Sequence, residues 1–303
     1  MSILVTGASG FIGSRLALEH KNVVVSASRN VQANSDFFIE DINRHTDWQT
    51  PLSGIKSVIH LAGTAHNSSD CHRKLLECDY EGTLKLMRDC GKYGVGRFVY
   101  ISTVNVYNNF YSRHPFGVKT QLSPTTVKAE FCVSIENNLK EISNELGIEL
   151  VIVRSPLVYG PNAPGNFRLL TKLVKKAPLL PFALVKNRRD FISVQNLVDL
   201  LIVCASHKNA AGHVFLASDN ETVSTREFID AVAYGQGKKV LQVPIPIGFM
   251  RFFGRLAGKT RMLDQLLDDL EVDSSNISEI LNWTPPYTMK EAMAMLRTEV
   301  KYK

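Results

Sequence analysis

The chain has 303 residues, 45% of them hydrophobic, so it can bury the core of one large domain or of a domain with a lobe. Its formal net charge is +6, its pI is near 9.0, and no basic run is longer than a few residues. This modest excess suits an anionic small ligand. It argues against a nucleic-acid-binding protein, because no basic stripe with interleaved aromatic residues occurs.

The cysteines and the apolar runs indicate the compartment. Neither CxxC nor metal-ligand spacing occurs among the five cysteines, which are Cys71, Cys78, Cys90, Cys132 and Cys204. We therefore predict no metal site and a reduced, cytoplasmic setting. We also expect no signal peptide and no membrane span, because the chain begins with a strand pattern and no apolar run is long enough.

The first predicted element is a buried strand over residues 3–6, and a helical pattern begins at Phe11. Between them, Gly7 allows a tight turn and Gly10 lets backbone N–H groups approach a pyrophosphate. Gly13 lets the helix lie close to the strand. The helix start offers unpaired donors and the positive end of its dipole to phosphates. Glycines in this strand-to-helix context predict a dinucleotide-binding loop.

The residues at the end of the second predicted strand, residues 23–28, bear on whether NAD or NADP binds. An acidic residue at its end would bind the adenosine ribose hydroxyls and favour NAD. This strand instead ends in Ser28 and Arg29, which tolerate a 2′-phosphate. We expect NADP to bind at least as well as NAD, unless Arg29 merely covers the surface.

Strands and helices then alternate along the chain. Strands are predicted over residues 37–41, 57–62, 97–103 and 149–154, with helical patterns over 71–93 and 124–146. Apolar strands that alternate with helices predict an α/β fold, a Rossmann-type doubly wound parallel sheet covered on both faces.

The second half of the chain predicts a smaller lobe. Residues 155–187 hold five prolines, too many for regular structure, and we interpret them as a substrate-covering excursion. The Rossmann domain is predicted over residues 1–155, with residues 188–211 returning to it. A mixed α/β substrate lobe is predicted over residues 156–187 and 212–303.

Eight segments carry a family resemblance: TGASGFIG (6–13), HLAG (60–63), EGT (81–83), FVYIST (98–103), KAE (128–130), RSPLVYGP (154–161), RRDFISVQNLVDL (188–200) and VDSSNISEILNWTPPYTMKEAM (272–293). With them the chain resembles the extended short-chain dehydrogenases, the NAD-dependent epimerase/dehydratase family that acts on nucleotide sugars. It looks most like bacterial UDP-sugar 4-epimerases and the related UDP-N-acetyl-quinovosamine-type 4-keto-reductases of surface polysaccharide biosynthesis. No single motif separates these two activities, and the resemblance allows a homodimer.

The resemblance implies a set of residues that bind NAD or NADP. This set comprises Gly7, Gly10, Phe11, Ile12, Gly13, Arg29, Asp41, Ile42, Leu61, Ala62, Gly63 and Lys128.

The resemblance also implies hydride transfer between a sugar carbon and the nicotinamide. In the family, a tyrosine exchanges the hydroxyl proton, a lysine four residues later lowers its pKa, and a Ser or Thr bonds the same oxygen. The i, i+4 spacing places tyrosine and lysine on one helix face. Here Thr103, or Ser102, matches the hydroxyl residue and Lys128 matches the lysine, but Pro124 stands in the place of the tyrosine.

The missing tyrosine leaves two functions open. Aliphatic hydroxyls nearby are far weaker acids than a phenol. Tyr107 and Tyr111 could swing in from the preceding loop, although ordinary loop aromatics are the more frequent case. An active enzyme is favoured by the retained set of Thr103, Lys128 and Arg189. A nucleotide-sugar-binding or NAD(P)-binding protein with impaired or no turnover is favoured by Pro124.

Substrate residues follow from the same resemblance. Asn166 and Phe167 match positions that contact the nucleotide sugar, and Arg189 matches the position that meets the diphosphate of a UDP-sugar. An arginine fork suits phosphate oxygens, and Arg188 is a weaker candidate. Asp199 is expected to cap or pair structurally. We assign no catalytic role to the two histidines that flank the cofactor loop, His60 and His66.

Overall fold

The computed structural model describes residues 2–29, 35–63, 75–107, 114–256, 258 and 260–297. Its main feature is a seven-stranded parallel sheet of order β10-β6-β5-β4-β1-β2-β3. The strands are β1 (Ile3–Thr6), β2 (Val24–Ser28), β3 (Phe37–Phe38), β4 (Ser57–His60), β5 (Arg97–Thr103), β6 (Glu149–Ser155) and β10 (Val214–Leu216). This sheet confirms the predicted Rossmann-type α/β fold.

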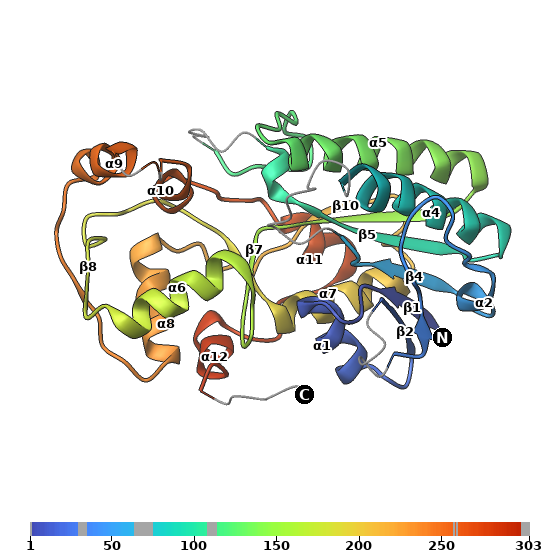
Figure 1. Ribbon diagram of the computed structural model, residues 1–303, viewed down its shortest axis with the longest axis horizontal. Coiled ribbons are helices and arrows are strands. Elements are labelled where there is room, and N and C mark those ends of the chain that lie inside the picture. Colours follow the sequence, from blue (N-terminus) through green and yellow to red (C-terminus); the bar gives the residue numbers. More distant parts are fainter. Residues whose placement is uncertain are drawn as a thin grey trace.

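Helices cover both faces of the sheet (Figure 1). One face carries α1 (Phe11–Glu19) and α7 (Val194–Ser206), and the other carries α4 (Thr83–Lys92) and α5 (Val127–Leu146). Successive strand residues point to opposite faces. Ile3 and Val5 therefore enter the core under α1 and α7, whereas Leu4 enters the core under α4 and α5. Because helices bury both faces of the sheet, the strands are apolar along their whole length.

The helix predicted from residue 124 begins three residues later. Thr126 is the N-cap of α5, and its side chain accepts from the backbone N–H of Ala129 at 3.2 Å. The helix ends at Leu146, and the C-cap residue Gly147 has a φ of 66°. A hydroxyl cap and a left-handed glycine are the usual boundaries of a helix. Pro124 therefore lies in the loop that leads into α5.

Short elements complete the Rossmann part. They are α2 (Gln49–Leu52), the π-helix η1 (Leu75–Gly82) that precedes α4, and the 3-10 turn η2 (Val104–Val106) that follows β5. The third strand is shorter than predicted, because only Phe37 and Phe38 pair with β2.

The prediction of an irregular segment over residues 155–187 is wrong. This segment contains β7 (Leu157–Tyr159), which pairs with β9 (Phe191–Ser193), then α6 (Gly165–Lys176), and β8 (Leu179–Leu180), which pairs with β11 (Leu241–Gln242). The prolines stand between these elements, and Pro164 is the N-cap residue of α6. A proline at a helix start lacks only a backbone N–H that would have no partner there. The number of prolines therefore does not exclude regular structure in this segment.

The lobe surrounds a core of its own. It contains α6, α8 (Thr225–Gly235), α9 (Ile247–Leu256), α10 (Thr260–Leu267) and α12 (Met289–Ala294). The ring of Phe228 stacks on Phe191 at 3.8 Å between centroids and contacts Phe167 at 6.1 Å. These aromatic side chains hold the lobe against β9.

The predicted lobe range of residues 212–303 is partly wrong. Strand β10 is an edge of the main sheet, and α11 (Ser275–Leu281) packs beside it. Trp283 enters the core under α1 and α7, and its indole N–H donates to Asp199 at 2.6 Å. This bond confirms the structural role expected for Asp199. The chain therefore returns to the Rossmann part twice after leaving it.

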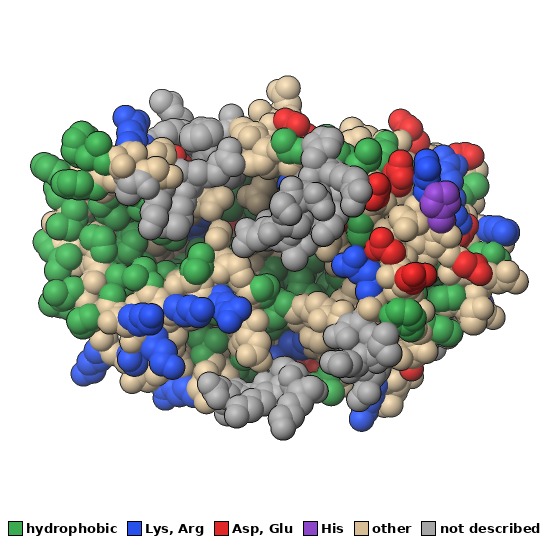
Figure 2. Space-filling model, viewed as in Figure 1, with side chains coloured by type: hydrophobic (Ala, Val, Ile, Leu, Met, Phe, Trp, Pro, Cys, Tyr) green, Lys and Arg blue, Asp and Glu red, His purple; other side chains and the backbone are tan. Residues whose placement is uncertain are grey.

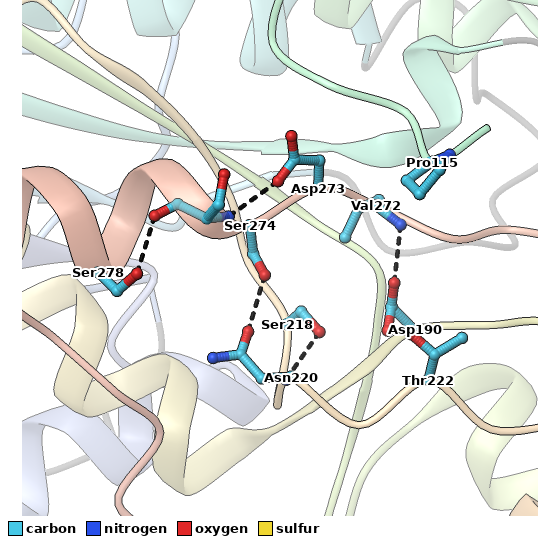
Figure 3. A pocket seen from close by; sticks show the side chains of 10 residues that line it. Pro115, Asp190, Ser218, Asn220, Thr222, Val272, Asp273, Ser274 and Ser278 are labelled. Atoms are coloured by element: carbon cyan, nitrogen blue, oxygen red, sulfur yellow. Dashed lines mark hydrogen bonds between the residues drawn. The ribbon is translucent and has the colours of Figure 1, made fainter.

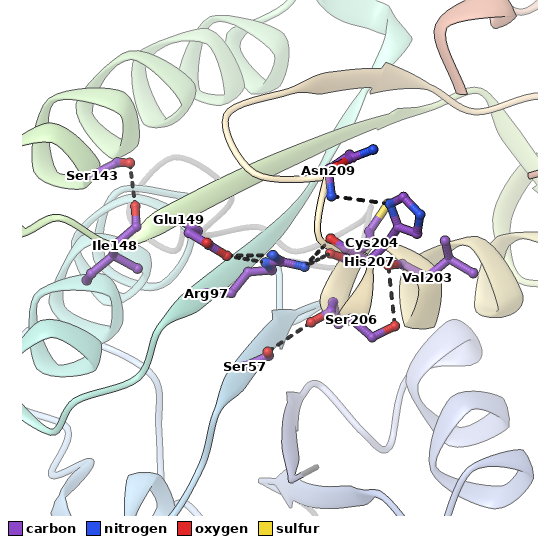
Figure 4. A network of polar contacts seen from close by, with 11 residues as sticks. Ser57, Arg97, Ser143, Ile148, Glu149, Val203, Cys204, Ser206, His207 and Asn209 are labelled. Atoms are coloured by element: carbon purple, nitrogen blue, oxygen red, sulfur yellow. Dashed lines mark hydrogen bonds and ion pairs between the residues drawn. The ribbon is translucent and has the colours of Figure 1, made fainter. Parts of the chain in front are cut away.

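Arg97 fixes the sheet edge at which the strands begin (Figure 4). Its guanidinium donates to Glu149 at 2.7 Å and to the carbonyls of Cys204 and His207 at 3.2 and 2.8 Å. Those carbonyls lie at the C-terminal end of α7, where a cation offsets the helix dipole. The opposite edge of the sheet is left for ligands.

The cysteines and the possibility of a membrane-spanning helix can be examined within the described residues. Cys78, Cys90, Cys132 and Cys204 are free thiols there, and Cys71 lies outside those residues. In the same part of the chain, no helix is long and apolar enough to cross a membrane.

Candidate active site

The glycine loop lies where β1 ends and α1 begins. Gly7 has a φ of 73°, and a Cβ there would lie 2.7 Å from the backbone nitrogen of Ala62. A Cβ on Gly13 would lie 2.2 Å from the carbonyl oxygen of Gly7. A Cβ on Gly10 would lie 3.1 Å from the same oxygen, a tight but far milder approach. The fold thus requires Gly7 and Gly13, whereas Gly10 mainly keeps space open.

The loop fits the pyrophosphate of a dinucleotide. Gly10 is the N-cap residue of α1, no side chain caps the helix, and its first turn holds no acidic residue. No side chain therefore caps the first backbone N–H groups of the helix, which suits the binding of an anion there. The side chains of Phe11 and Ile12 pack on the core under α1, so these two residues would contribute through their backbone.

His60 joins the loop to its neighbours. Its ring nitrogens bond the hydroxyls of Thr6 at 2.7 Å and Thr83 at 2.8 Å. Burial lowers the pKa of His60 to about 4, so the ring is neutral and structural. Leu61 and Ala62 follow it beside Gly7, and the next residue, Gly63, lies near the Asp79 side chain. His66 lies outside the described residues.

The predicted adenosine end is only partly described. Arg29 forms an ion pair with Asp41 at 3.2 Å, and both side chains are more than half exposed. Ile42 is buried, and a Cβ on Gly82 would lie 2.7 Å from its side chain. Residues 30–34 lie outside the described residues. Arg29 is thus held by a weak surface pair that a ligand phosphate could displace.

The two candidate hydroxyls at the end of β5 differ in direction. Ser102 is buried and donates to Glu136 of α5 at 2.6 Å. Thr103 is half-buried and accepts from the backbone N–H of Asn105 at 3.2 Å. Neighbouring strand residues face opposite sides of the sheet; Ser102 faces α5, where Glu136 engages its hydroxyl, whereas Thr103 is the last residue of β5, at the carboxyl end of the strand. Thr103 is the better placed of the two.

A buried polar network holds this strand end. Arg154 contacts the carboxylate of Glu136 with two nitrogens, at 3.1 and 2.5 Å. Its third nitrogen donates to the Tyr107 hydroxyl at 2.6 Å, and that hydroxyl donates to the Gly117 carbonyl at 3.0 Å. A buried ion pair persists only when its remaining donors and acceptors are satisfied, as they are here. No local pattern in the sequence predicts this network; the only signal is the carboxylate of Glu136, two helical turns after Lys128.

Tyr107 does not replace the missing tyrosine. It is fully buried, its ring stacks on Phe116 at 5.1 Å, and its hydroxyl is engaged as donor and acceptor. Burial raises its pKa against the opposing effect of Arg154. The suggestion that it could swing in is therefore wrong. Tyr111 lies outside the described residues.

Lys128 lies in the first turn of α5, at the ligand edge of the sheet. It is half-buried, and Cys132 follows one turn later, close enough for the ammonium charge to act on the thiol. Burial nevertheless raises the pKa of Cys132 to about 11. Tyr100 of β5 bonds this thiol, and burial raises its pKa well above the usual value. Neither group is a suitable acid at neutral pH.

The predicted substrate residues lie along the lobe. Asn166 is exposed and bonds Gln265 at 3.2 Å, whereas the side chain of Phe167 is 1% exposed and belongs to the lobe core. Arg189 donates to the carbonyl of Asp268 at 2.6 Å, and desolvation lowers its pKa to about 10. Arg188 is exposed and engaged by both oxygens of Glu271. Arg189 is thus the stronger candidate for an anionic ligand.

A polar hollow of about 440 Å³ is lined by Pro115, Asp190, the segment 218–222 that follows β10, and residues 272–278 (Figure 3). Asp190 accepts there from the Thr222 hydroxyl at 2.9 Å and from the Val272 backbone N–H at 2.7 Å. These groups satisfy one another, so we assign the hollow no ligand. Among the described residues, no cluster of three or more His, Cys, Asp or Glu could hold a metal.

Comparisons with known proteins agree with this geometry. The family model described as "NAD dependent epimerase/dehydratase family" matches residues 3–217. A UDP-glucose 4-epimerase of Vibrio cholerae is 36% identical, over 96% of this chain and 92% of that protein. The N-acetyl-alpha-D-glucosaminyl-diphospho-ditrans,octacis-undecaprenol 4-epimerase of Escherichia coli O157:H7 is 22% identical over 82% and 77%. The UDP-glucuronic acid 4-epimerase of Bacillus cereus, solved with NAD, has a TM-score of 0.77 at 21% identity, with 99% of each chain covered.

Proposed function

Because this chain belongs to the NAD-dependent epimerase/dehydratase family, we propose that it acts on a UDP-hexose or UDP-N-acetylhexosamine, as a 4-epimerase or a 4-keto-reductase in surface polysaccharide biosynthesis. The topology supports the proposal: the glycine loop follows the carboxyl end of β1, Thr103 ends β5, and Lys128 lies in the first turn of α5, the helix that connects β5 to β6. Parallel α/β sheets bind their ligands at the carboxyl ends of their strands.

Each residue has a definite task in this proposal. The backbone around Gly10 would hold the pyrophosphate, and Lys128 would hold the nicotinamide ribose. Thr103 would bond the sugar oxygen whose proton moves, while Arg189 and Asn166 would bind the nucleotide part. When bound, the nicotinamide supplies the exchange of a hydride with the sugar. The Glu136–Arg154 pair would keep Thr103 in position.

Cofactor stoichiometry separates the two activities. An epimerase restores its cofactor in each cycle, so trace NAD supports many turnovers, whereas a reductase consumes one reduced cofactor per product. The Vibrio cholerae relative favours the epimerase. The test supplies UDP-glucose and UDP-N-acetylglucosamine with trace NAD, and a UDP-4-keto sugar with excess reduced cofactor. If no UDP-sugar binds in calorimetry, the proposal fails as a whole.

The alternative is a UDP-sugar-binding protein with impaired turnover. It is supported by Pro124 and by the engaged hydroxyl of Tyr107. We expect UDP-sugar binding to persist while the rate stays below about 1 s⁻¹. Introducing the phenol with Pro124→Tyr should raise that rate by about 10²–10⁴-fold, the usual worth of a positioned acid. The control Pro124→Phe should not raise it.

The choice of cofactor can be tested at Arg29. We expect NADP(H) to bind at least as well as NAD(H), because the end of β2 carries no acidic residue. Arg29→Ala should weaken NADP(H) binding and leave NAD(H) binding nearly unchanged. A wild-type preference for NAD(H) of about tenfold or more, 1.4 kcal/mol, would contradict this expectation.

A further inference from the structure

Helix α9 presents an apolar face to the outside of the protein. Phe249, Phe252, Phe253 and Leu256 are 60%, 57%, 61% and 70% exposed. Their spacing of i, i+3, i+4 and i+7 is that of a stripe that normally faces a core. The exposed side chains therefore form one continuous surface, and they are not scattered single residues of the kind found on any protein.

The packing of α9 fixes this orientation. Met250 and Gly254, one turn apart, are its buried residues, and a Cβ on Gly254 would lie 2.1 Å from Leu263 of α10. Arg251 forms an ion pair with Asp268 at 2.7 Å. Turning the aromatic face inward would break this pair and separate α9 from α10. The exposed face is thus a property of the folded lobe.

The apolar surface continues onto the small sheet of β8 and β11. Leu179 and Leu241 are partners in its register and are 54% and 64% exposed. Ile245, at the start of the segment that leads into α9, is also exposed. Figure 2 shows hydrophobic side chains gathered at the end of the molecule that carries α9 and β8. We call these residues, from α9, β8, β11 and Ile245, the apolar end of the lobe.

The two chain segments that form the apolar end contain Lys and Arg but no Asp or Glu, although Asp230 of α8 accepts from Gln242 of β11 and Asp268 pairs with Arg251. Residues 165–189 contain seven Lys and Arg and no Asp or Glu, and residues 236–263 contain six and none. The whole chain has a net charge of +6, so the remainder is acidic overall. The exposed residues Lys175 and Lys176 lie three to four positions before Leu179, and the exposed residues Lys238 and Lys239 lie two to three positions before Leu241. Basic residues therefore border the apolar end.

We propose that the apolar end of the lobe docks onto the surface of an anionic lipid bilayer. An aromatic face bordered by Lys and Arg suits the boundary between headgroups and acyl chains. The Lys and Arg would contact the anionic headgroups, each giving about fivefold in affinity. A lipid surface accepts rings along a convex helix without a matching groove. The docking does not depend on the reaction that the Rossmann part performs.

Vesicle co-sedimentation of the full chain, without substrate or cofactor, tests the proposal. Vesicles of phosphatidylcholine alone are compared with vesicles that also contain phosphatidylglycerol. We expect binding to the anionic vesicles that weakens as salt is added. The double variant Phe252→Gln, Phe253→Gln should lose at least about tenfold in binding. The control Leu18→Gln, which removes an exposed apolar residue of α1, should bind like the wild type.

A second variant separates charge from apolar contact. Lys176→Gln with Lys239→Gln and Arg255→Gln should reduce binding to anionic vesicles by on the order of 100-fold. It should leave any binding to phosphatidylcholine unchanged. Folded wild-type protein that stays in the supernatant with both vesicle types would overturn the proposal. So would a wild-type dimer that becomes monomeric in the double phenylalanine variant without any vesicle binding, because a second copy would then cover this face.

Discussion

The Rossmann part buries several polar side chains, whereas the apolar end of the lobe exposes aromatic side chains. In the Rossmann part, Glu136, Arg154 and His60 are buried, and each is bonded to other protein groups. In the lobe, Phe252 and Phe253 are exposed and contact each other at 5.5 Å between centroids. These buried polar groups of the Rossmann part have hydrogen-bond partners within the protein, whereas the described part of the chain leaves these aromatic rings of the lobe exposed. The difference separates polar residues that are satisfied within the fold from apolar residues that remain exposed to solvent.

The largest expected effect is at Gly13. Gly13→Ala would place a methyl group 2.2 Å from the Gly7 carbonyl, so we expect a loss of at least about 4 kcal/mol in the free energy of unfolding. Gly10→Ala, with its 3.1 Å approach, should remain folded and bind the cofactor poorly. Urea denaturation and calorimetry measure the two effects. Equal stability losses at both positions would contradict the separate roles of these glycines.

The buried network is the next test of the contrast. Glu136→Gln leaves the Arg154 charge buried without its partner, and we expect a loss of about 3–5 kcal/mol in the free energy of unfolding. The matched double variant Glu136→Leu, Arg154→Met should recover most of that loss, because no unpaired charge remains. Urea denaturation of both variants decides the point. A loss below about 1 kcal/mol in Glu136→Gln would place the pair in effectively solvated surroundings.

His60 gives a pH-dependent test. Its folded-state pKa of about 4 lies below the usual 6.5, so the unfolded chain binds the extra proton first as the pH falls. Stability from this residue is present above pH 6.5 and is lost between pH 6.5 and 4, to a total of about 3 kcal/mol. We compare unfolding of the wild type and His60→Asn across this range, because burial also raises the pKa of Asp219 to about 6 and acts in the opposite direction. Parallel curves for the two proteins would show that His60 is not the group responsible.

The smallest expected change in the free energy of unfolding is at the exposed aromatic face of α9. It is compared with a substitution in the core of the same lobe. Phe253→Gln removes an aromatic side chain that is 61% exposed, and we expect the free energy of unfolding to change by less than about 0.5 kcal/mol. Phe228→Ala, in the lobe core, should cost about 3–5 kcal/mol. Thermal or urea unfolding measures both. A large loss in Phe253→Gln would mean that the aromatic face supports the fold itself.

Local sequence signals were sufficient for much of the Rossmann part. Three glycines between a strand and a helix and the run of apolar strands follow from spacing and composition. These features depend on neighbours in the chain or on strand periodicity, which a sequence contains directly. The same reasoning failed for residues 155–187, because proline counts do not show that the prolines lie between the elements.

Other features were decided only by tertiary structure. Tyr107 is tied to Arg154 and Gly117, 47 and 10 residues away, and no local pattern predicts such bonds. The outward direction of α9 depends on Leu263 and Asp268 holding its other side. The basic segments 165–189 and 236–263 are separated in sequence and come together through β8 and β11. A sequence determines which residues are apolar or charged, but long-range packing decides which of them face one another and which face outward.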